Sequence, residues 1–444
     1  MSTNISLKHI NKLAIPALIA GIAEPILSIT DTAIVGNISE NATESLAAVG
    51  IVGTFISMLI WVLGQTRSAI SSIVSQYVGA NKLERVTNLP AQAIFITTAI
   101  SLFIILGTYP FADSIFKLYN ASNLILNYSV EYYQIRVFGF PFTLFTFAIF
   151  GTFRGLQNTY YPMVIAIIGA SVNVLLDVVL VYGITGYIPA MNIKGAAYAS
   201  VIAQILMAFI AAYYLLTKTH IPLRFSFPFN PEIKRFIGMI LNLFVRTLAL
   251  NVTLYFASSF STSYGKAQIA AYTIAINLWF LGAFIIDGYA SAGNILSGKL
   301  LGAKAYKKLV ILSKKLVKYG VLLGLAMAAV GALGYKYIGF IFTQETAVLN
   351  EFQNVFWLIL AMQPLCAVAF IFDGMFKGMG KMKTLRNVLL FATFVVFIPV
   401  VFILDHLQYQ LLGIFIAITV WIIARGLPLI IKFRQEFLPL SEKQ

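Results

Sequence analysis

The chain has 444 residues, of which 59% are hydrophobic and 11% are charged, and its formal net charge is +15. Soluble domains carry about a quarter charged residues, so this composition excludes a soluble protein and predicts a membrane protein. The positive charge does not indicate a nucleic-acid partner, because the basic residues gather in alternate loops.

Twelve apolar segments are long enough to cross a bilayer as helices, since about 20 residues span hydrocarbon ~30 Å thick. The sequence predicts spans at residues 12–37, 47–76, 88–109, 126–151, 160–184, 194–217, 235–262, 268–298, 310–337, 350–376, 384–404 and 410–432. The fold class is therefore an all-α polytopic membrane protein.

Basic residues are divided unequally between the two sides of the predicted spans. Of the 31 Lys and Arg residues, 23 fall in the termini and the loops on one side, and four fall on the other side. The remaining four lie within spans: Arg67, Arg136, Arg246 and Arg425. The positive-inside rule then predicts a multi-pass protein of the inner (cytoplasmic) membrane with both termini in the cytoplasm.

The second half of the chain repeats the first. QYVGAN at 76–81 matches KLLGAK at 299–304, and GTFRG at 151–155 matches GMFKG at 374–378, each with an offset of 223 residues. We predict an N-terminal lobe at 1–217, a proline-rich cytoplasmic linker at 218–233 and a C-terminal lobe at 234–444. Two parallel six-helix repeats are typical of transporters that work by alternating access.

The first lobe carries acidic residues within its spans. A carboxylate at a helix centre costs ~2.5–3.5 kcal/mol unless it faces a partner or a cavity. Asp31 and Asp177 fall at a similar depth, and Asn173 shares a helix face with Asp177. Such oxygens predict either a Na⁺ site at Asp31, Asn173 and Asp177 or a pair of carboxylates that takes up a proton. The alternative is that Asp177 only caps or hydrogen-bonds a neighbouring helix.

Further residues of the first span have two interpretations each. Glu24 lies at a depth close to that of Arg67, so it forms either a structural ion pair or part of the coupling site. Pro16 and Pro25 both interrupt the helical hydrogen bonds and kink the span. The kink is either a bending element that responds to the charge on Asp31 or a fixed packing feature.

The second lobe has a different polar pattern. Asp287 and Asn294 lie seven residues apart on one helix face, and Arg246 lies at a depth similar to that of Asp287. An internal Arg246–Asp287 ion pair is the first interpretation, and a protonatable cavity is the second. Asp373 precedes Lys377 by four residues, which predicts anchoring by local basic groups or, alternatively, contact with substrate.

Other chemistry is poorly supported by the sequence. GNILSGK at 293–299 resembles a P-loop, but Leu300 replaces the Ser or Thr and no strand precedes it. The three His residues are scattered outside the spans, and no nucleophile–base pattern is visible. We therefore expect no enzyme activity and no cofactor other than a coupling ion. A flippase for lipids or lipid-linked oligosaccharides and a membrane-embedded enzyme are the alternatives.

Several stretches resemble the multidrug and toxic compound extrusion (MATE) family. They are TDTAIVG, QYVGAN, YYQIRVFGFP, FRGLQNT, NVLLD and KGAAYAS in the first half, with RTLAL and IDGYASAGNILSGKLLGA in the second half similar to its DinF-type branch. The resemblance covers nearly the whole chain. It departs in one place, because the seventh span lacks the acid that NorM-type relatives carry, and this favours the first lobe for coupling.

The resemblance implies a V-shaped pair of lobes that exports small organic, often cationic and amphipathic compounds by H⁺ or Na⁺ antiport. It also implies a monomer embedded in membrane lipid, with Pro16 at the family's bending proline. Carried over to this chain, the family's first-lobe site consists of Asp31, Asn173, Asp177, Tyr132 and Ser200.

Overall fold

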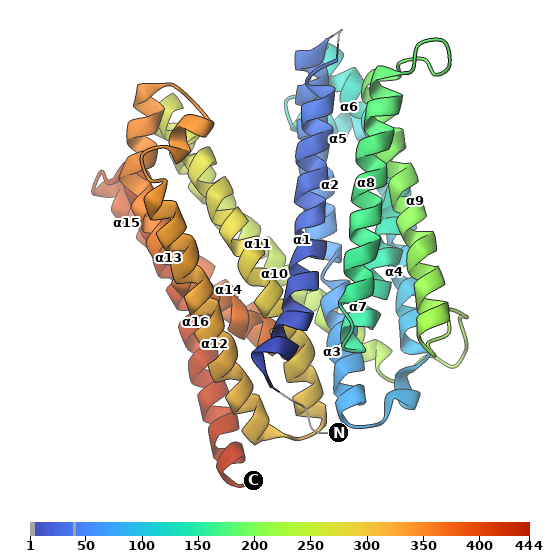
Figure 1. Cartoon of the computed structure of the whole chain (residues 1–444). Helices are drawn as coiled ribbons and strands as arrows, with labels where there is room; N and C mark the ends of the chain where they lie inside the picture. The colour runs from blue at the N-terminus through green and yellow to red at the C-terminus, as the bar shows by residue number, and fades with distance from the viewer. Residues whose placement is uncertain (1–4, 39–40) are drawn as a thin grey trace. The chain divides into compact units, whose positions relative to one another are not determined.

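The structure, a computed structural model, describes residues 5–38 and 41–444, including all of their side chains except those of residues 23–29. Regular structure in this described part is helical, apart from an isolated bridge between Ile184 and Ile188. The predicted all-α class is confirmed. Figure 1 shows that most of the helices are long.

The described residues of the first half of the chain form nine α-helices. They are α1 (Leu7–Val35), α2 (Ala42–Leu63), α3 (Thr66–Gly79), α4 (Leu89–Thr108), α5 (Ala112–Leu118), α6 (Asn123–Arg136), α7 (Phe140–Gly155), α8 (Tyr160–Tyr182) and α9 (Asn192–Lys218).

The second half of the chain forms seven α-helices. They are α10 (Ile233–Ser263), α11 (Lys266–Gly302), α12 (Tyr306–Leu333), α13 (Thr346–Gly378), α14 (Met382–Leu390), α15 (Ile398–His406) and α16 (Gln410–Glu442).

Eleven helical segments of the described chain are long and apolar enough to cross a membrane. The twelfth predicted span is α1, which includes the positions whose side chains are not described. Most predicted boundaries fall within a few residues of the observed ones. The final helix is the exception, since it continues ten residues beyond the predicted end at 432.

Three spans contain breaks that a hydropathy pattern does not predict. Gly64 and Gln65 separate α2 from α3, and a 3₁₀ turn at Val137–Gly139 separates α6 from α7. A π-helix at Phe391–Phe397 joins α14 to α15. A proline lies in the first turn of both α7 and α15, and its missing N–H explains why the regular helix is interrupted just before it.

The chain divides into two compact units. The C-terminal unit consists of Met1–Leu18, Ser75–Asn81 and Gly238–Gln444, and the N-terminal unit consists of Ile19–Val74 and Lys82–Ile237. The chain therefore passes from one unit to the other within α1, within α3, between residues 81 and 82, and within α10. The first crossing follows Pro16 by two residues.

Glycine contacts show that the repeat in the sequence is also a repeat in the packing. In the N-terminal unit, a Cβ on Gly151 would lie 2.5 Å from the carbonyl oxygen of Arg67. In the C-terminal unit, a Cβ on Gly374 would collide in the same way with the carbonyl oxygen of Ala290. Gly374 follows Gly151 by 223 residues, and Ala290 follows Arg67 by the same number. Small residues at such crossings let membrane helices approach closely, so each half uses the same close contact.

A second pair of glycines makes a reciprocal contact within the C-terminal unit. A Cβ on Gly79 would collide with the carbonyl oxygen of Lys299, and a Cβ on Gly302 would collide with that of Gln76. The side-chain amide of Gln76 also donates to the carbonyl oxygen of Gly378 over 2.9 Å. Lys299 is the counterpart of Gln76, and Gly302 is the counterpart of Gly79. The two contacts therefore exchange corresponding residues, which is the pattern of a twofold contact. The QYVGAN and KLLGAK repeats therefore pack against each other.

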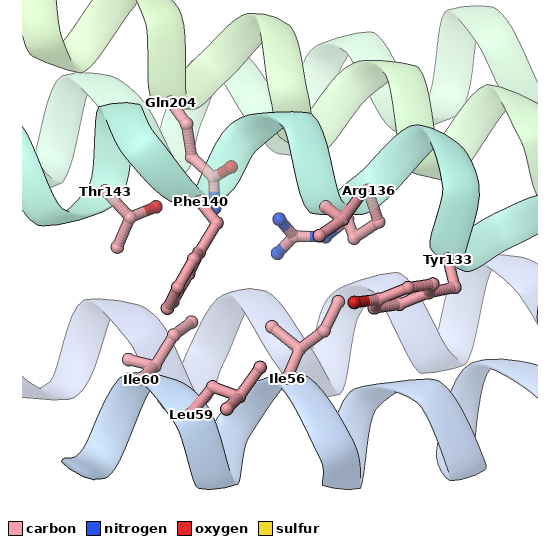
Figure 2. A pocket seen from close by; sticks show the side chains of 9 residues that line it. Ile56, Leu59, Ile60, Tyr133, Arg136, Phe140, Thr143 and Gln204 are labelled. Atoms are coloured by element: carbon pink, nitrogen blue, oxygen red, sulfur yellow. The ribbon is translucent and has the colours of Figure 1, made fainter. Parts of the chain in front are cut away.

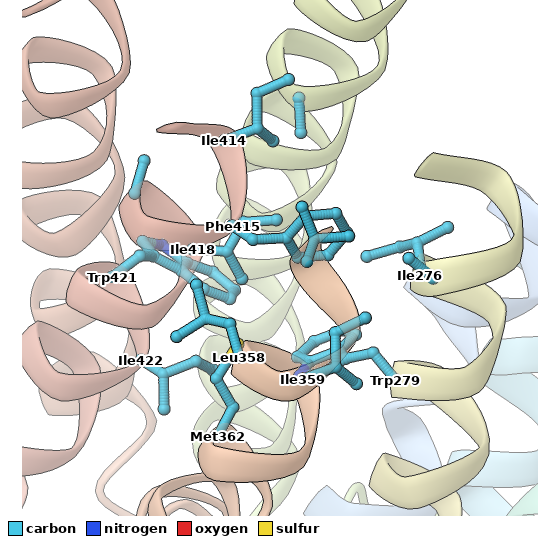
Figure 3. Packing of buried hydrophobic residues seen from close by; sticks show 14 of the residues in the cluster. Ile276, Trp279, Leu358, Ile359, Met362, Ile414, Phe415, Ile418, Trp421 and Ile422 are labelled. Carbon is cyan, nitrogen blue, oxygen red and sulfur yellow. The ribbon is translucent and has the colours of Figure 1, made fainter. Parts of the chain in front are cut away.

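An extensive apolar cluster fills the C-terminal unit. Large side chains from α11, α13 and α16 interlock there, and Figure 3 labels Ile276, Trp279, Leu358, Ile359, Met362, Ile414, Phe415, Ile418, Trp421 and Ile422. The indole N–H of Trp279 donates to the Sγ of Cys366 over 3.3 Å. The single cysteine is thus a buried core residue, and this packing fixes the helices that carry the unit's charged residues.

Candidate ion-coupling site

Small residues bring α8 and α9 close together in the N-terminal unit (Figure 1). A Cβ on Gly195 would lie 2.5 Å from the carbonyl oxygen of Leu180, and the backbone N–H of Met191 donates to the same oxygen over 2.9 Å. Alanines continue this face of α9. As a result, the Oγ of Ser200 reaches Asn173 on α8, whose Nδ2 donates to it over 3.4 Å.

The end of α1 is attached to the same pair of helices. The hydroxyl of Tyr182 donates to the carbonyl oxygen of Ile34 over 2.9 Å. One turn earlier on α1, Asp31 accepts a hydrogen bond of 3.2 Å from the Oγ of Ser200 at its Oδ2 atom. The carboxyl groups of Asp31 and Asp177 lie within hydrogen-bonding reach of each other. Three helices therefore bring the predicted acids together.

The site holds buried oxygen atoms that lack hydrogen-bond donors. Asp31, Asn173 and Asp177 are at most 5% exposed. Within the described part of the chain, no donor reaches Oδ1 of Asp31, Oδ1 of Asn173 or either carboxyl oxygen of Asp177. Unsatisfied buried acceptors are costly, so this arrangement favours a bound cation or an added proton. Both fit the observed donor set of carboxylate and amide oxygens.

Tyr132 and Arg136 lie beside the carboxylates, one helical turn apart on α6. Tyr132 is buried and interacts electrostatically with both acids and with the guanidinium of Arg136. Arg136 also attracts both carboxylates. Sequence reasoning identified Arg136 only as a cation within a span. Its spacing of four residues from Tyr132, which puts the two on one helix face, is the signal that would have found it.

Arg136 also lines a narrow pocket with a cavity volume of about 10 Å³, which is room for about one water molecule. Figure 2 shows Arg136 and Gln204 pointing toward it from above Ile56, Leu59 and Ile60 of α2. Its lining is mostly apolar. Arg136 therefore belongs both to the carboxylate site and to the lining of this pocket.

Two residues predicted for the first span have side chains that the structure does not describe. They are Glu24 and Pro25, so the predicted pairing of Glu24 with Arg67 is not described. The guanidinium of Arg67 lies 5.2 Å from the centre of the Phe147 ring. Pro16 lies within α1, just before the chain passes between the two units.

The C-terminal unit corrects the predicted ion pair. Arg246 binds Asp373, with 2.5 Å between Nη2 and Oδ1, and Asp287 is exposed. The predicted Arg246–Asp287 pair is therefore wrong: Asp373, which lies on α13, is the nearer carboxylate. The predicted anchoring of Asp373 by Lys377 is confirmed at 3.0 Å. Asn294 is buried on α11, the helix that also carries Asp287.

Arg425 completes this charged cluster. Its Nη2 lies 3.6 Å from Oδ1 of Asp373, and its guanidinium lies 4.8 Å from the Phe370 ring centre and 5.4 Å from that of Trp421. The sequence did not predict this contact, because Arg425 lies on α16, more than 50 positions away from Asp373. One buried carboxylate therefore balances cations from three places in the sequence.

Replacing Asp373 by Asn is expected to destabilise the fold. Two buried arginines and Lys377 would lose their shared counter-charge, and breaking a buried ion pair from one side costs about 3–5 kcal/mol. Thermal unfolding of the purified protein in detergent should show a clearly lower midpoint. The matched control is Asp113→Asn, which removes an exposed pair with Lys117. Equal midpoints for the two variants would contradict the structural role of Asp373.

These features define a class of protein. The chain is a multi-pass helical membrane protein with two homologous halves and buried ionisable groups inside its spans, as in secondary transporters. The MatE family model matches residues 16–179 and 238–403, one stretch in each half. The chain therefore belongs to the MatE (multidrug and toxic compound extrusion) family, whose members transport small organic compounds and are not in general enzymes.

Curated relatives match across most of the chain. Protein DETOXIFICATION 42 of Arabidopsis thaliana is 24% identical over 94% of this chain and 90% of its own length. DNA damage-inducible protein F of Escherichia coli (strain K12) is 24% identical over 96% of this chain and 91% of its own length. Multidrug export protein MepA of Staphylococcus aureus (strain NCTC 8325 / PS 47) is 22% identical over 75% and 73%. The resemblance to MATE and DinF-type proteins is confirmed.

A solved structure has the same fold. The crystal structure of MATE in the bent conformation aligns with a TM-score of 0.90 at 22% identity, and the match covers 98% of this chain and 96% of that one. At this identity the likeness shows the fold.

Proposed function

We propose that the protein is a secondary active exporter of small organic compounds, coupled to H⁺ or Na⁺ by the site at Asp31, Asn173 and Asp177. The observation that carries the proposal is the set of buried oxygen atoms without donors on these residues. Ser200, Tyr132 and Arg136 complete the site. Two carboxylates and one guanidinium leave one net negative charge, which a single proton or sodium ion would neutralise.

Coupling needs a difference in affinity between two states of the protein. In the proposed cycle, the ion enters from outside, neutralises the carboxylates and changes the position of α1, with Pro16 as the bending point. Substrate binding weakens and the substrate leaves outward. The ion is then released inward. Glu24 and Pro25 are further candidates in the same span.

The topology of the proposed transporter follows the distribution of basic residues. The protein is a monomer of the inner membrane, surrounded by lipid, with both termini cytoplasmic and with lobes at 1–217 and 234–444. Its substrates are amphipathic and often cationic.

Transport in proteoliposomes tests the proposal and identifies the ion. A Na⁺ gradient and a pH gradient are imposed separately, and efflux of ethidium is followed by fluorescence. One gradient is expected to drive efflux and the other to have no effect. Dissipating the effective gradient with an ionophore should stop transport. Efflux that responds to neither gradient would exclude coupling at this site.

A further inference from the structure

The segment between α9 and α10 is fastened to the start of α4 by one buried amide. Gln92 is 0% exposed, and its Nε2 donates to the carbonyl oxygens of Ser226 over 2.7 Å and Pro228 over 3.1 Å. Its Oε1 accepts from the backbone N–H of Asn230 over 2.8 Å. A buried amide with its donors and acceptor satisfied holds a segment in one position. We call residues 219–232 the strap.

The side chain of Asn230 also attaches the strap to the residues before α4. Asn230 is also buried, and its Nδ2 donates to the carbonyl oxygen of Arg85 and to Oδ1 of Asn88, each within 2.8 Å. Its Oδ1 accepts from the backbone N–H of Glu232 over 3.0 Å. Arg85 and Asn88 precede α4, so the strap lies along the end of that helix. It is part of the N-terminal unit rather than a free linker.

The strap presents a ridge of aromatic rings. Phe225, Phe227 and Phe229 contact one another, with centres 5.0 Å apart for the first pair and 5.2 Å for the second. Phe225 continues the ridge to Phe95 on α4 at 4.7 Å. Phe227 is 73% exposed and Phe229 is 49% exposed. Large rings so exposed need an apolar partner.

The ridge adjoins the apolar outer face of a membrane span. Phe95, Leu102 and Leu106 are spaced seven and four residues apart, which places them on one face of α4. They are 56%, 51% and 74% exposed, and an 18-residue window of the segment Leu83–Thr108 has a mean hydropathy of 2.1. Such a face contacts acyl chains. The ridge begins at Phe95, about 9 Å from the start of α4 at 1.5 Å per residue, where hydrocarbon gives way to headgroups.

Positive charge flanks the ridge. Arg224 precedes Phe225 and is exposed, and Arg85, whose carbonyl oxygen is held by Asn230, is exposed as well. Lys218 and Lys234 are exposed at the two ends of the strap. The acidic neighbours are Glu84, which is exposed, and Glu232, which is paired with Arg235 at 3.2 Å. The surface around the rings therefore carries an excess of cations.

We infer that the strap is a lipid anchor: its rings insert at the membrane interface, and Arg224 and Arg85 bind the phosphates of anionic phospholipids. Aromatic rings concentrate at this depth, and basic groups near an anionic membrane surface are attracted to it. The proposed orientation places the anchor in the cytoplasmic leaflet. The anchor itself needs no transport activity, so its test is independent of the proposed exporter.

A fluorescent label at Phe227 tests the insertion of the ridge. Cys366 is the only cysteine, so Cys366→Ala gives a background into which Phe227→Cys is introduced and labelled with nitrobenzoxadiazole. The matched site is Glu442→Cys at the exposed end of α16, a helix of 33 residues and so about 50 Å long, which continues past the hydrocarbon. In lipid nanodiscs the label at 227 should emit at shorter wavelength and be quenched severalfold less by iodide. Equal iodide quenching at both sites would overturn the anchor.

The lipid composition tests the role of the arginines. Phe227-labelled protein is placed in nanodiscs of phosphatidylcholine alone or with added phosphatidylglycerol. The anionic lipid should further lower iodide quenching at 227, and this change should be lost in the Arg224→Gln, Arg85→Gln double variant. A Lys307→Gln variant, altered at an exposed cation in the C-terminal unit, should keep it. No response to the anionic lipid, or an unchanged response in the double variant, would contradict phosphate binding.

Discussion

Asp177→Asn is expected to reduce gradient-driven efflux to background while the protein stays folded. Both carboxyl oxygens of Asp177 are buried and lack donors within the described residues, and its negative charge interacts with Asp31, Arg136 and Tyr132. Asparagine keeps the shape and removes the charge that attracts a cation or accepts a proton. Efflux of ethidium from proteoliposomes, driven by the effective gradient, measures the loss.

The control for this prediction is Asp113→Asn, an exposed acid of the same unit that pairs with Lys117. It should transport at the wild-type rate. The thermal midpoint of Asp177→Asn should be equal to or above that of the wild type, because a buried charge has been removed. Retention of full coupled efflux by Asp177→Asn would refute the assignment of the site.

Gly302→Ala is expected to destabilise the protein and to impair transport. A Cβ at this position collides with the carbonyl oxygen of Gln76, a backbone atom that cannot rotate away. Overpacking of this kind costs about 1–3 kcal/mol, more than the roughly 0.5–1 kcal/mol by which alanine favours a helix over glycine. Thermal unfolding in detergent should give a lower midpoint than the wild type.

The reciprocal contact provides an internal check on this prediction. Gly79→Ala adds a Cβ against Lys299 and should lower the midpoint by a similar amount. Gly238→Ala, in α10, meets no atom within 4 Å and should be neutral or slightly stabilising. If all three variants unfolded at the same temperature, the close contact between the two repeats would make no contribution to the stability of the protein.

For the candidate site, the sequence pattern predicts which residues take part but not which of them are in contact. The sequence pairs Asp31 with Asp177 because a carboxylate inside a span needs a polar partner or a cavity, and because both residues fall at a similar depth in the membrane. The same argument does not single out Arg136, because its sequence position does not distinguish it from the other arginines within spans. Its contact with Tyr132 depends on the direction in which α6 faces, and α6 ends at a 3₁₀ turn that hydropathy does not reveal.

The charged cluster of the C-terminal unit shows the limit of depth as a guide. Arg246 and Asp287 were matched by their distance from the ends of their helices, yet Arg246 binds Asp373 and Asp287 is exposed. Depth gives one coordinate of a side chain. The rotation of each helix gives the other, and apolar packing among α11, α13 and α16 sets that rotation.

The sequence by itself determined the all-helical membrane class, the order of the spans and the repeat, because hydrocarbon demands long apolar helices and duplication leaves a constant offset. Only the tertiary structure decided which residues meet: Asp373 with three cations, Tyr132 with Arg136, and the strap with Gln92. Such contacts depend on helix rotation, breaks within spans and loop attachment. Those arise from side-chain packing between distant segments, which a linear pattern of hydropathy and charge does not encode.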